Sequence, residues 1–119
     1  MTRRLCILAG LLAAAGFAQQ DAPKRLYVVT YVDVFPNGAA DTAKWLQQLA
    51  EDSRKESGSV RFEVFRDVER TNHFTIVEAW QSRPAYEAHL MQDHTKSFRQ
   101  KIQQYLGSPF DERLYYSLP

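Results

Sequence analysis

The stretch that most constrains the fold is residues 73–94, HFTIVEAWQSRPAYEAHLMQDH, in which a strand pattern changes to a helix pattern within two residues. Ser82 can cap this helix through its hydroxyl, and Pro84 suits the first turn because its missing N–H would have no intrahelical partner. Side chains alternate across a strand, so one face of the strand carries Phe74, Ile76, Glu78 and Trp80. The short turn therefore predicts a helix that folds back over a row of apolar side chains containing one carboxylate.

All three histidines, His73, His89 and His94, lie in this stretch. His89 and His94 are five residues apart, which is about 140° around an ideal helix. Both can face one pocket only if the helix breaks between them. Thr95 can cap a second helix, so the sequence allows such a break. A metal site built from His89, Asp93 and His94 is not expected from this spacing.

The segment 26–35, LYVVTYVDVF, is the most apolar strand pattern in the chain. One predicted face carries Leu26, Val28, Thr30, Val32 and Val34, and the other carries Tyr27, Val29, Tyr31, Asp33 and Phe35. Both faces are largely apolar, and the helices of so short a chain can cover only one of them. We therefore expect the second face to pack against another subunit.

The remaining elements complete a simple order. We expect a helix over residues 39–57 ended by Gly58, a strand over 60–68, and a last strand over 112–118. The predicted order is β-α-β-β-α-β, a ferredoxin-like α+β fold with an antiparallel sheet and helices on one face. Two such sheets packed face to face would form a homodimer.

Residues 1–18 have the character of an export signal. Arg3 and Arg4 precede an apolar run, 5–15, and Gly16-Phe17-Ala18 places small residues where signal peptidase cleaves. The run is too short for a lasting membrane anchor, which needs about 20 apolar residues. We expect an exported, periplasmic or secreted protein with a polar lead-in at residues 19–24 and one domain at residues 25–118.

Charge and cysteine content exclude several classes of function. The leader contains two of the 15 basic residues and none of the 14 acidic ones, so the mature chain is nearly neutral and does not resemble a nucleic-acid-binding protein. The single cysteine, Cys6, lies in the leader. The mature domain is thus predicted to have no disulfide, no thiolate metal site and no cysteine nucleophile.

The pattern F-x-x-x-E-x-W, a short capped turn and A-H-x-x-x-x-H resembles the antibiotic biosynthesis monooxygenase family over most of residues 25–118. The matching positions are Phe74, Glu78, Trp80, His89, His94 and Phe98. The resemblance implies a dimeric α+β barrel, and some members oxidise quinols or aromatic polyketides with O2 and no metal or flavin. Haem-degrading members use a first-strand asparagine, and polyketide oxidases use a central-strand asparagine. Neither strand has one here.

These observations predict a catalytic pocket formed by His89, His94, Trp80 and Glu78, with Phe74, Ile76 and Phe98 as substrate-binding walls. One histidine would be the general base, Trp80 would hold an aromatic ring, and Glu78 would orient the histidine or anchor the helix. A buried Glu78 must be paired or have a raised pKa. Simple packing for Trp80 and a structural ion pair for Glu78 remain open.

The sequence supports a small monooxygenase that oxidises a quinol or other phenolic molecule with O2 and has no bound cofactor or metal. A non-catalytic small-ligand-binding or stress-response module would need the same apolar pocket with a few polar groups. Haem degradation is a further alternative within the family.

Overall fold

The computed structural model describes residues 24–119. The predicted export signal and most of the polar lead-in lie outside the described residues, so export stays a prediction, which the N-terminal mass of the mature protein would test. Within residues 24–119, none of the helices combines the length and the apolar character that crossing a membrane requires.

The chain follows the predicted order, with the second helix in two pieces. The elements are β1 (Leu26–Asp33), the 3-10 helix η1 (Pro36–Gly38), α2 (Ala39–Arg54), β2 (Ser59–Arg66), β3 (His73–Trp80), α3 (Arg83–Leu90), α4 (Asp93–Ile102) and β4 (Asp111–Tyr115). The strands form one antiparallel sheet in the order β2-β3-β1-β4. This is the expected ferredoxin-like α+β fold.

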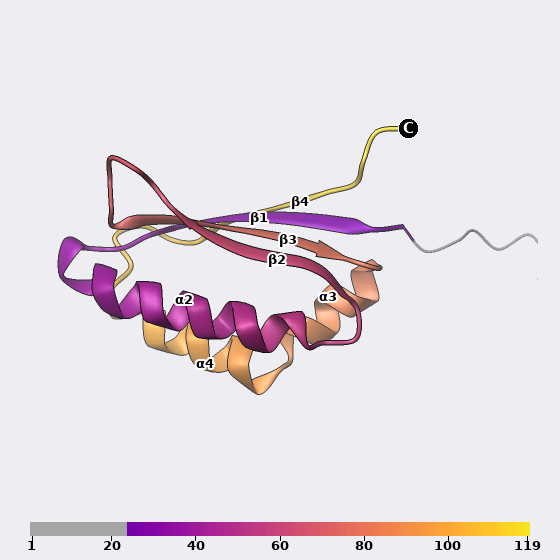
Figure 1. The fold of residues 1–119 in the computed structure, drawn as a ribbon, viewed down its shortest axis with the longest axis horizontal. Helices are drawn as coiled ribbons and strands as arrows, with labels where there is room; N and C mark the ends of the chain where they lie inside the picture. The colour runs from indigo at the N-terminus through magenta and orange to yellow at the C-terminus, as the bar shows by residue number, and fades with distance from the viewer. Residues whose placement is uncertain (1–23) are drawn as a thin grey trace, which may run out of the picture.

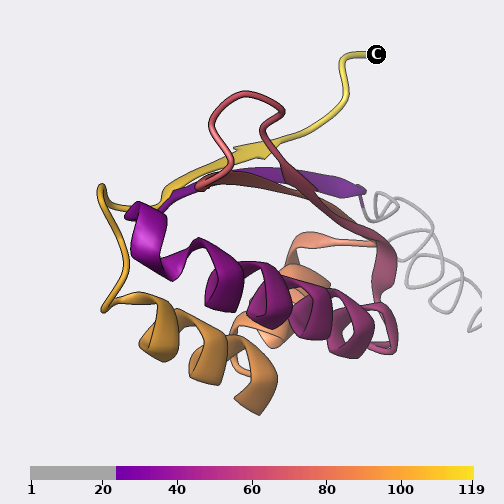
Figure 2. The ribbon, with the colours of Figure 1, turned by 60° about the vertical axis from the view of Figure 1, so that its left-hand side comes forward.

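The sheet and the helices form two layers. Figures 1 and 2 show α2, α3 and α4 together on one face of the sheet, while the C-terminus lies beyond the other face. The two central strands, β1 and β3, pair antiparallel, with Val28 opposite Glu78 and Leu26 opposite Trp80. The face of β3 that carries Glu78 and Trp80 therefore points into the layer of helices.

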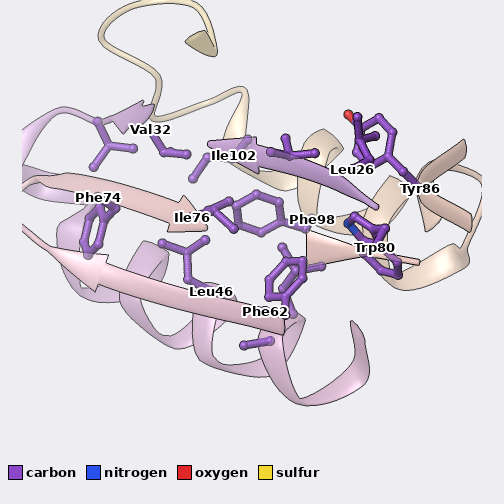
Figure 3. Packing of buried hydrophobic residues seen from close by; sticks show 14 residues of the cluster. Leu26, Val32, Leu46, Phe62, Phe74, Ile76, Trp80, Tyr86, Phe98 and Ile102 are labelled. Atoms are coloured by element: carbon purple, nitrogen blue, oxygen red, sulfur yellow. The ribbon is translucent and has the colours of Figure 1, made fainter. Parts of the chain in front are cut away.

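The core lies between these layers. Trp80, Phe62 and Ile102 are almost fully buried, together with Phe98 from α4 and Leu46 from α2 (Figure 3). The alternation predicted for residues 26–35 is confirmed, since Leu26, Val28, Thr30, Val32 and Val34 are all buried. The opposite sheet face exposes 41% of Tyr31, 46% of Phe65 and 47% of Tyr115.

Element ends differ from the predicted ones by a few residues. The first long helix ends at Arg54 and not near Ser57, because the Glu56 N–H bonds to the Ser53 carbonyl at 3.1 Å and closes a tight turn. Gly58 is not its cap. A Cβ at Gly58 would lie 2.4 Å from Ala85 Cβ, so glycine is needed because this loop approaches α3 closely.

The strands are also slightly shorter or shifted. The first ends at Asp33, the second covers Ser59–Arg66, and the last covers Asp111–Tyr115 and not residues 112–118. Val34, beyond the end of β1, still forms an isolated bridge with Leu106. Sequence alternation continues past these points, but ladder hydrogen bonds stop where no neighbouring strand remains opposite.

Candidate functional site

Strand β3 places Glu78 and Trp80 side by side in the interior. Glu78 is 3% exposed and Trp80 is fully buried. The Trp80 indole N–H donates a hydrogen bond of 2.9 Å to Glu78 Oε1. Two residues on one face of a strand therefore form one unit, in which the indole fixes the position of the carboxyl group.

Helix α3 brings His89 onto this unit. Ser82 caps the helix as predicted, since its Oγ accepts a hydrogen bond from the Ala85 N–H at 3.2 Å. The His89 ring centroid then lies 4.6 Å from that of Trp80, with 33° between the planes. His89 Nε2 lies 3.8 Å from Glu78 Oε1. The predicted proximity of Glu78, Trp80 and His89 is thus present.

The helix breaks between His89 and His94. Helix α3 ends at Leu90 and α4 begins at Asp93, with Gln92 in an extended backbone conformation as the N-cap residue. This break cancels the 140° separation expected on a continuous helix. The proposed capping by Thr95 is wrong, because the helix already restarts at Asp93 and Thr95 falls in its first turn, facing inward. Its Oγ1 lies 3.3 Å from His89 Nδ1.

Glu56 joins the two histidines, and the sequence analysis missed it. Glu56 Oε2 lies 2.8 Å from His89 Nδ1 and 2.8 Å from His94 Nε2. Glu56 comes from the turn between α2 and β2, far from the histidines in sequence. A glutamate in a polar turn carries no local pattern that marks it as buried, so only the folded chain reveals this partner.

Burial changes the protonation of two of these groups. Desolvation raises the pKa of Glu78 to about 7, although the hydrogen bond from Trp80 opposes that rise. Desolvation also lowers the pKa of His89, while the hydrogen bond and charge of Glu56 oppose that change. Near neutral pH, His89 is therefore a neutral imidazole beside a carboxyl group that exchanges its proton in the same range.

Glu78 and His89 line a small internal cavity of about 10 Å³, which is about the space of one water molecule, whereas Trp80 and His94, predicted for the same pocket, do not line it. Its apolar walls include Leu49, Phe62, Ile76, Phe98 and Phe110, and its polar groups belong to Thr30, Glu78, His89, Thr95 and Arg99. The buried Thr30 hydroxyl has no hydrogen-bond partner within residues 24–119. A mostly apolar space with a few convergent polar groups is typical of small-molecule sites.

The proposed substrate-binding residues divide into two groups. Ile76 and Phe98 line the internal cavity. Phe74 does not: it lies at the opposite end of the core from Trp80 (Figure 3) and stacks beneath the Arg66 guanidinium, 4.9 Å from the ring centroid. The position of Phe74 at the start of β3 explains this separation, since alternation gives a shared face but not proximity.

His94 lies at the edge of the site. Its side chain is 22% exposed and lines two outer hollows, of about 550 Å³ and about 130 Å³. The smaller hollow lies between α2 and α4 and shares Leu49 and Phe98 with the internal cavity. These two side chains therefore form the wall between the outer hollow and the buried site.

The site is also tied to the edge strand β4. Glu112 Oε1 accepts hydrogen bonds from the Tyr86 hydroxyl and, at 3.0 Å, from Arg99 Nη2. Arg99 also lines the cavity, together with Glu78 and His89. The carboxylate of Glu112 balances the positive charge of Arg99 at this position. This network links α3, α4 and β4 around the site.

Comparisons with known proteins identify the family of this chain. Residues 25–101 match the family described as "Antibiotic biosynthesis monooxygenase". The chain is 28% identical over 81 residues to the Bacillus subtilis (strain 168) protein named "Putative monooxygenase YcnE", covering 68% of this chain and 85% of that protein.

Solved structures show the same fold at low identity. PA3566 from Pseudomonas aeruginosa superposes with a TM-score of 0.77 at 21% identity, covering 84% of this chain and all of that one. A structure described as an antibiotic biosynthesis monooxygenase gives 0.76 at 21% identity, covering 79% and 99% of the two chains. The family match spans most of the chain and includes β1, β3 and both histidine-bearing helices. The chain therefore belongs to the antibiotic biosynthesis monooxygenase family.

Proposed function

We propose that this protein is a monooxygenase that oxidises a quinol or other phenolic small molecule with O2 and without a bound cofactor. The observation that carries this proposal is the placement of His89 on the cavity wall, where Nδ1 lies 2.8 Å from Glu56 Oε2 and Nε2 lies 3.8 Å from Glu78 Oε1. An ionised carboxylate only accepts hydrogen bonds, so Nδ1 carries the proton and Nε2 keeps its lone pair. His89 is then oriented as a general base.

Deprotonation of the substrate starts the reaction. His89 Nε2 takes the proton of a phenolic hydroxyl, and its lowered pKa keeps the imidazole neutral and ready to accept it. Glu56 stabilises the imidazolium that forms, as a carboxylate does in hydrolase triads. Glu78 lines the cavity beside His89 and binds the substrate through its carboxyl group, whereas Trp80 does not line the cavity and acts through the hydrogen bond that fixes Glu78.

The phenolate then reacts with O2 directly. It transfers one electron to O2, and the resulting radical pair couples to form a C–O bond and a hydroperoxide. Cleavage of the O–O bond releases water and leaves one oxygen atom on the product, so a hydroquinone and O2 give a hydroxyquinone and H2O. The substrate supplies all four electrons, and the dry apolar walls protect the radical pair from water.

Substrate entry requires a side-chain movement. An aromatic ring does not fit into about 10 Å³, but the neighbouring hollow of about 130 Å³ shares Leu49 and Phe98 with the cavity. Rotation of Phe98 would join the two spaces between α2 and α4. We infer that Phe98 is both a wall of the site and the residue that opens it.

Oxygen uptake with a panel of hydroquinones tests the proposed function. The wild-type protein, kept in a chelating buffer, is expected to consume O2, and His89→Ala should lower the rate about 10²- to 10⁴-fold because the general base is lost. His73→Ala is the matched control, since His73 lies at the far end of β3 beside Asp33 and should keep the wild-type rate. If His89→Ala keeps full activity and His94→Ala is inactive, His94 is the general base. If neither variant loses activity, the mechanism is wrong, and if the wild type consumes no O2 the site is a binding module.

A further inference from the structure

Glu56, His89 and His94 have a second property that goes beyond the proposed function. Their ligand-type atoms, one carboxylate oxygen and two imidazole nitrogens, all lie within 4.8 Å of one another. Among residues 24–119 this is the one group of three or more such side chains with this convergence. The three residues come from separate elements, the turn after α2, helix α3 and helix α4, so their convergence depends on the tertiary fold.

The donor set matches a transition-metal site. Two imidazoles and one carboxylate suit Zn²⁺ and its neighbours in the first row, and three protein ligands with one open position are typical of accessible zinc sites. Bonds of about 2.0–2.1 Å in a tetrahedron place neighbouring ligand atoms about 3.3 Å apart. Glu56 Oε2 lies 2.8 Å from each nitrogen, and all three atoms lie within 4.8 Å of one another, so side-chain rotations that bring the three pairs towards this spacing make room for the ion.

The surroundings of His89 resemble the outer shell of a metal site. Metal-binding histidines usually present the other ring nitrogen to a carboxylate, which fixes the ring. His89 turns Nδ1 towards Glu56 and His94, and its Nε2 lies 3.8 Å from Glu78 Oε1. Glu78 is in turn held by the Trp80 indole. A carboxyl group thus faces the other ring nitrogen at 3.8 Å, slightly beyond hydrogen-bond distance, and it is separate from the three ligands.

An ion can reach this cluster from outside. Glu56 and His94 line the hollow of about 550 Å³ that opens beside the break between α3 and α4. Their side chains are 12% and 22% exposed, whereas that of His89 is 3% exposed. The buried histidine therefore forms the floor of the site, and the two partly exposed residues form its entrance, where water can complete the coordination.

We propose that Glu56, His89 and His94 form a binding site for a divalent transition-metal ion of the Zn²⁺ class. A bound ion occupies His89 Nδ1 and leaves the proton on Nε2. The metal-bound form and the form in which His89 acts as a base therefore exclude each other. Binding is measured without substrate, so the result does not depend on whether the protein oxidises a quinol.

Calorimetric titration of the tag-free, chelator-stripped protein with Zn²⁺ tests the site. One Zn²⁺ per chain is expected, with an affinity that falls at least about tenfold in His94→Ala and in Glu56→Gln, because even the loss of an outer-shell partner typically costs 10- to 100-fold. His73→Ala is the matched control and should bind like the wild type, because it removes a histidine outside the cluster.

Co²⁺ provides a readout on the unaltered protein. Coordination by two imidazoles and a carboxylate with an open position should give the intense visible bands of a four- or five-coordinate ion. The weak bands of the hydrated ion would count against the site. Equal Zn²⁺ affinity in the wild type, His94→Ala and Glu56→Gln, or no saturable binding below millimolar Zn²⁺, would overturn the proposal.

Discussion

The buried carboxyl group of Glu78 makes the stability of the protein depend on pH, and this dependence can be measured. Its pKa is raised from 4.5 to about 7 by burial, so the native state binds the proton more tightly than the unfolded chain. The stability from this difference is fully present below pH 4.5 and is lost as the pH rises through 7. His89 acts in the opposite sense, because its lowered pKa makes protonation unfavourable to the native state as the pH falls through 6.5.

Replacing Glu78 with Gln should remove its part of this pH dependence. Between pH 5.5 and pH 8 the Glu78 titration lowers the free energy of unfolding of the wild type by about 2 kcal/mol, whereas a neutral amide does not titrate. Urea denaturation at the two pH values measures the effect, and Glu63→Gln on the exposed part of β2 is the control. An unchanged pH slope in Glu78→Gln would show that Glu78 is ionised in the native protein at neutral pH.

Single residues were predictable where strand alternation fixed their direction. The common face of Glu78 and Trp80, and the inward direction of Ile76, followed from spacing of two along β3. Phe74 shares that face but lies too far along the strand to join the cavity. Glu56 was missed because its approach to the histidines depends on a tight turn, and Thr30 because a hydroxyl in an apolar strand has no distinguishing local pattern.

At the scale of elements, the site depends on how closely the turn after α2 approaches α3. The Gly58 carbonyl accepts a hydrogen bond from the Gln81 N–H at 2.9 Å, and a Cβ at Gly58 would lie 2.4 Å from Ala85 Cβ. This contact holds the turn that carries Glu56 against the helix that carries His89. The sequence predicted the helix that carries His89 but placed Glu56 inside the preceding helix, and the spacing of the two elements is a tertiary property.

Gly58→Ala should therefore destabilise the protein by about 1–3 kcal/mol through overpacking. Ala85→Gly removes the opposing methyl group, so the double variant Gly58→Ala/Ala85→Gly should recover part of that loss. Chemical denaturation of the four proteins gives the coupling free energy. Strictly additive changes would mean that the two methyl groups do not meet.

The break between α3 and α4 could be predicted from the sequence only in part. The need for a break followed from the five-residue spacing of His89 and His94. The position of the break did not follow from the sequence. Gln92 adopts the N-cap conformation without a side-chain hydrogen bond, and the Thr95 hydroxyl turns towards His89 instead. Weak caps of this kind are set by packing and not by local preference.

For the molecule as a whole, the open face of the sheet predicts a homodimer. Tyr31, Phe65 and Tyr115 are between 41% and 47% exposed on the face opposite the helices. Burying such aromatic side chains is the usual driving force for association. A second copy that covers this face would explain why both faces of residues 26–35 are largely apolar.

Tyr31→Asp should shift a dimer towards monomer or aggregate, because a charge would be buried at the contact. Light scattering at micromolar concentration measures the mass. Met91→Asp is the control, since Met91 is 66% exposed between α3 and α4, on the helical side of the sheet and away from the proposed contact (Figure 1). A monomeric wild type, or a dimer unaffected by Tyr31→Asp, would contradict face-to-face packing.

The central claim, that this fold uses His89 to insert one oxygen atom from O2 into a phenolic substrate, is tested most directly with ¹⁸O₂. A hydroquinone identified by oxygen uptake is converted by the chelator-treated protein under ¹⁸O₂, and the product mass is determined. The account predicts a hydroxyquinone with a single ¹⁸O atom, formed much more slowly by His89→Ala than by the wild type. An unlabelled quinone accompanied by H2O2, or formation of the labelled product at the same rate with and without His89, would contradict it.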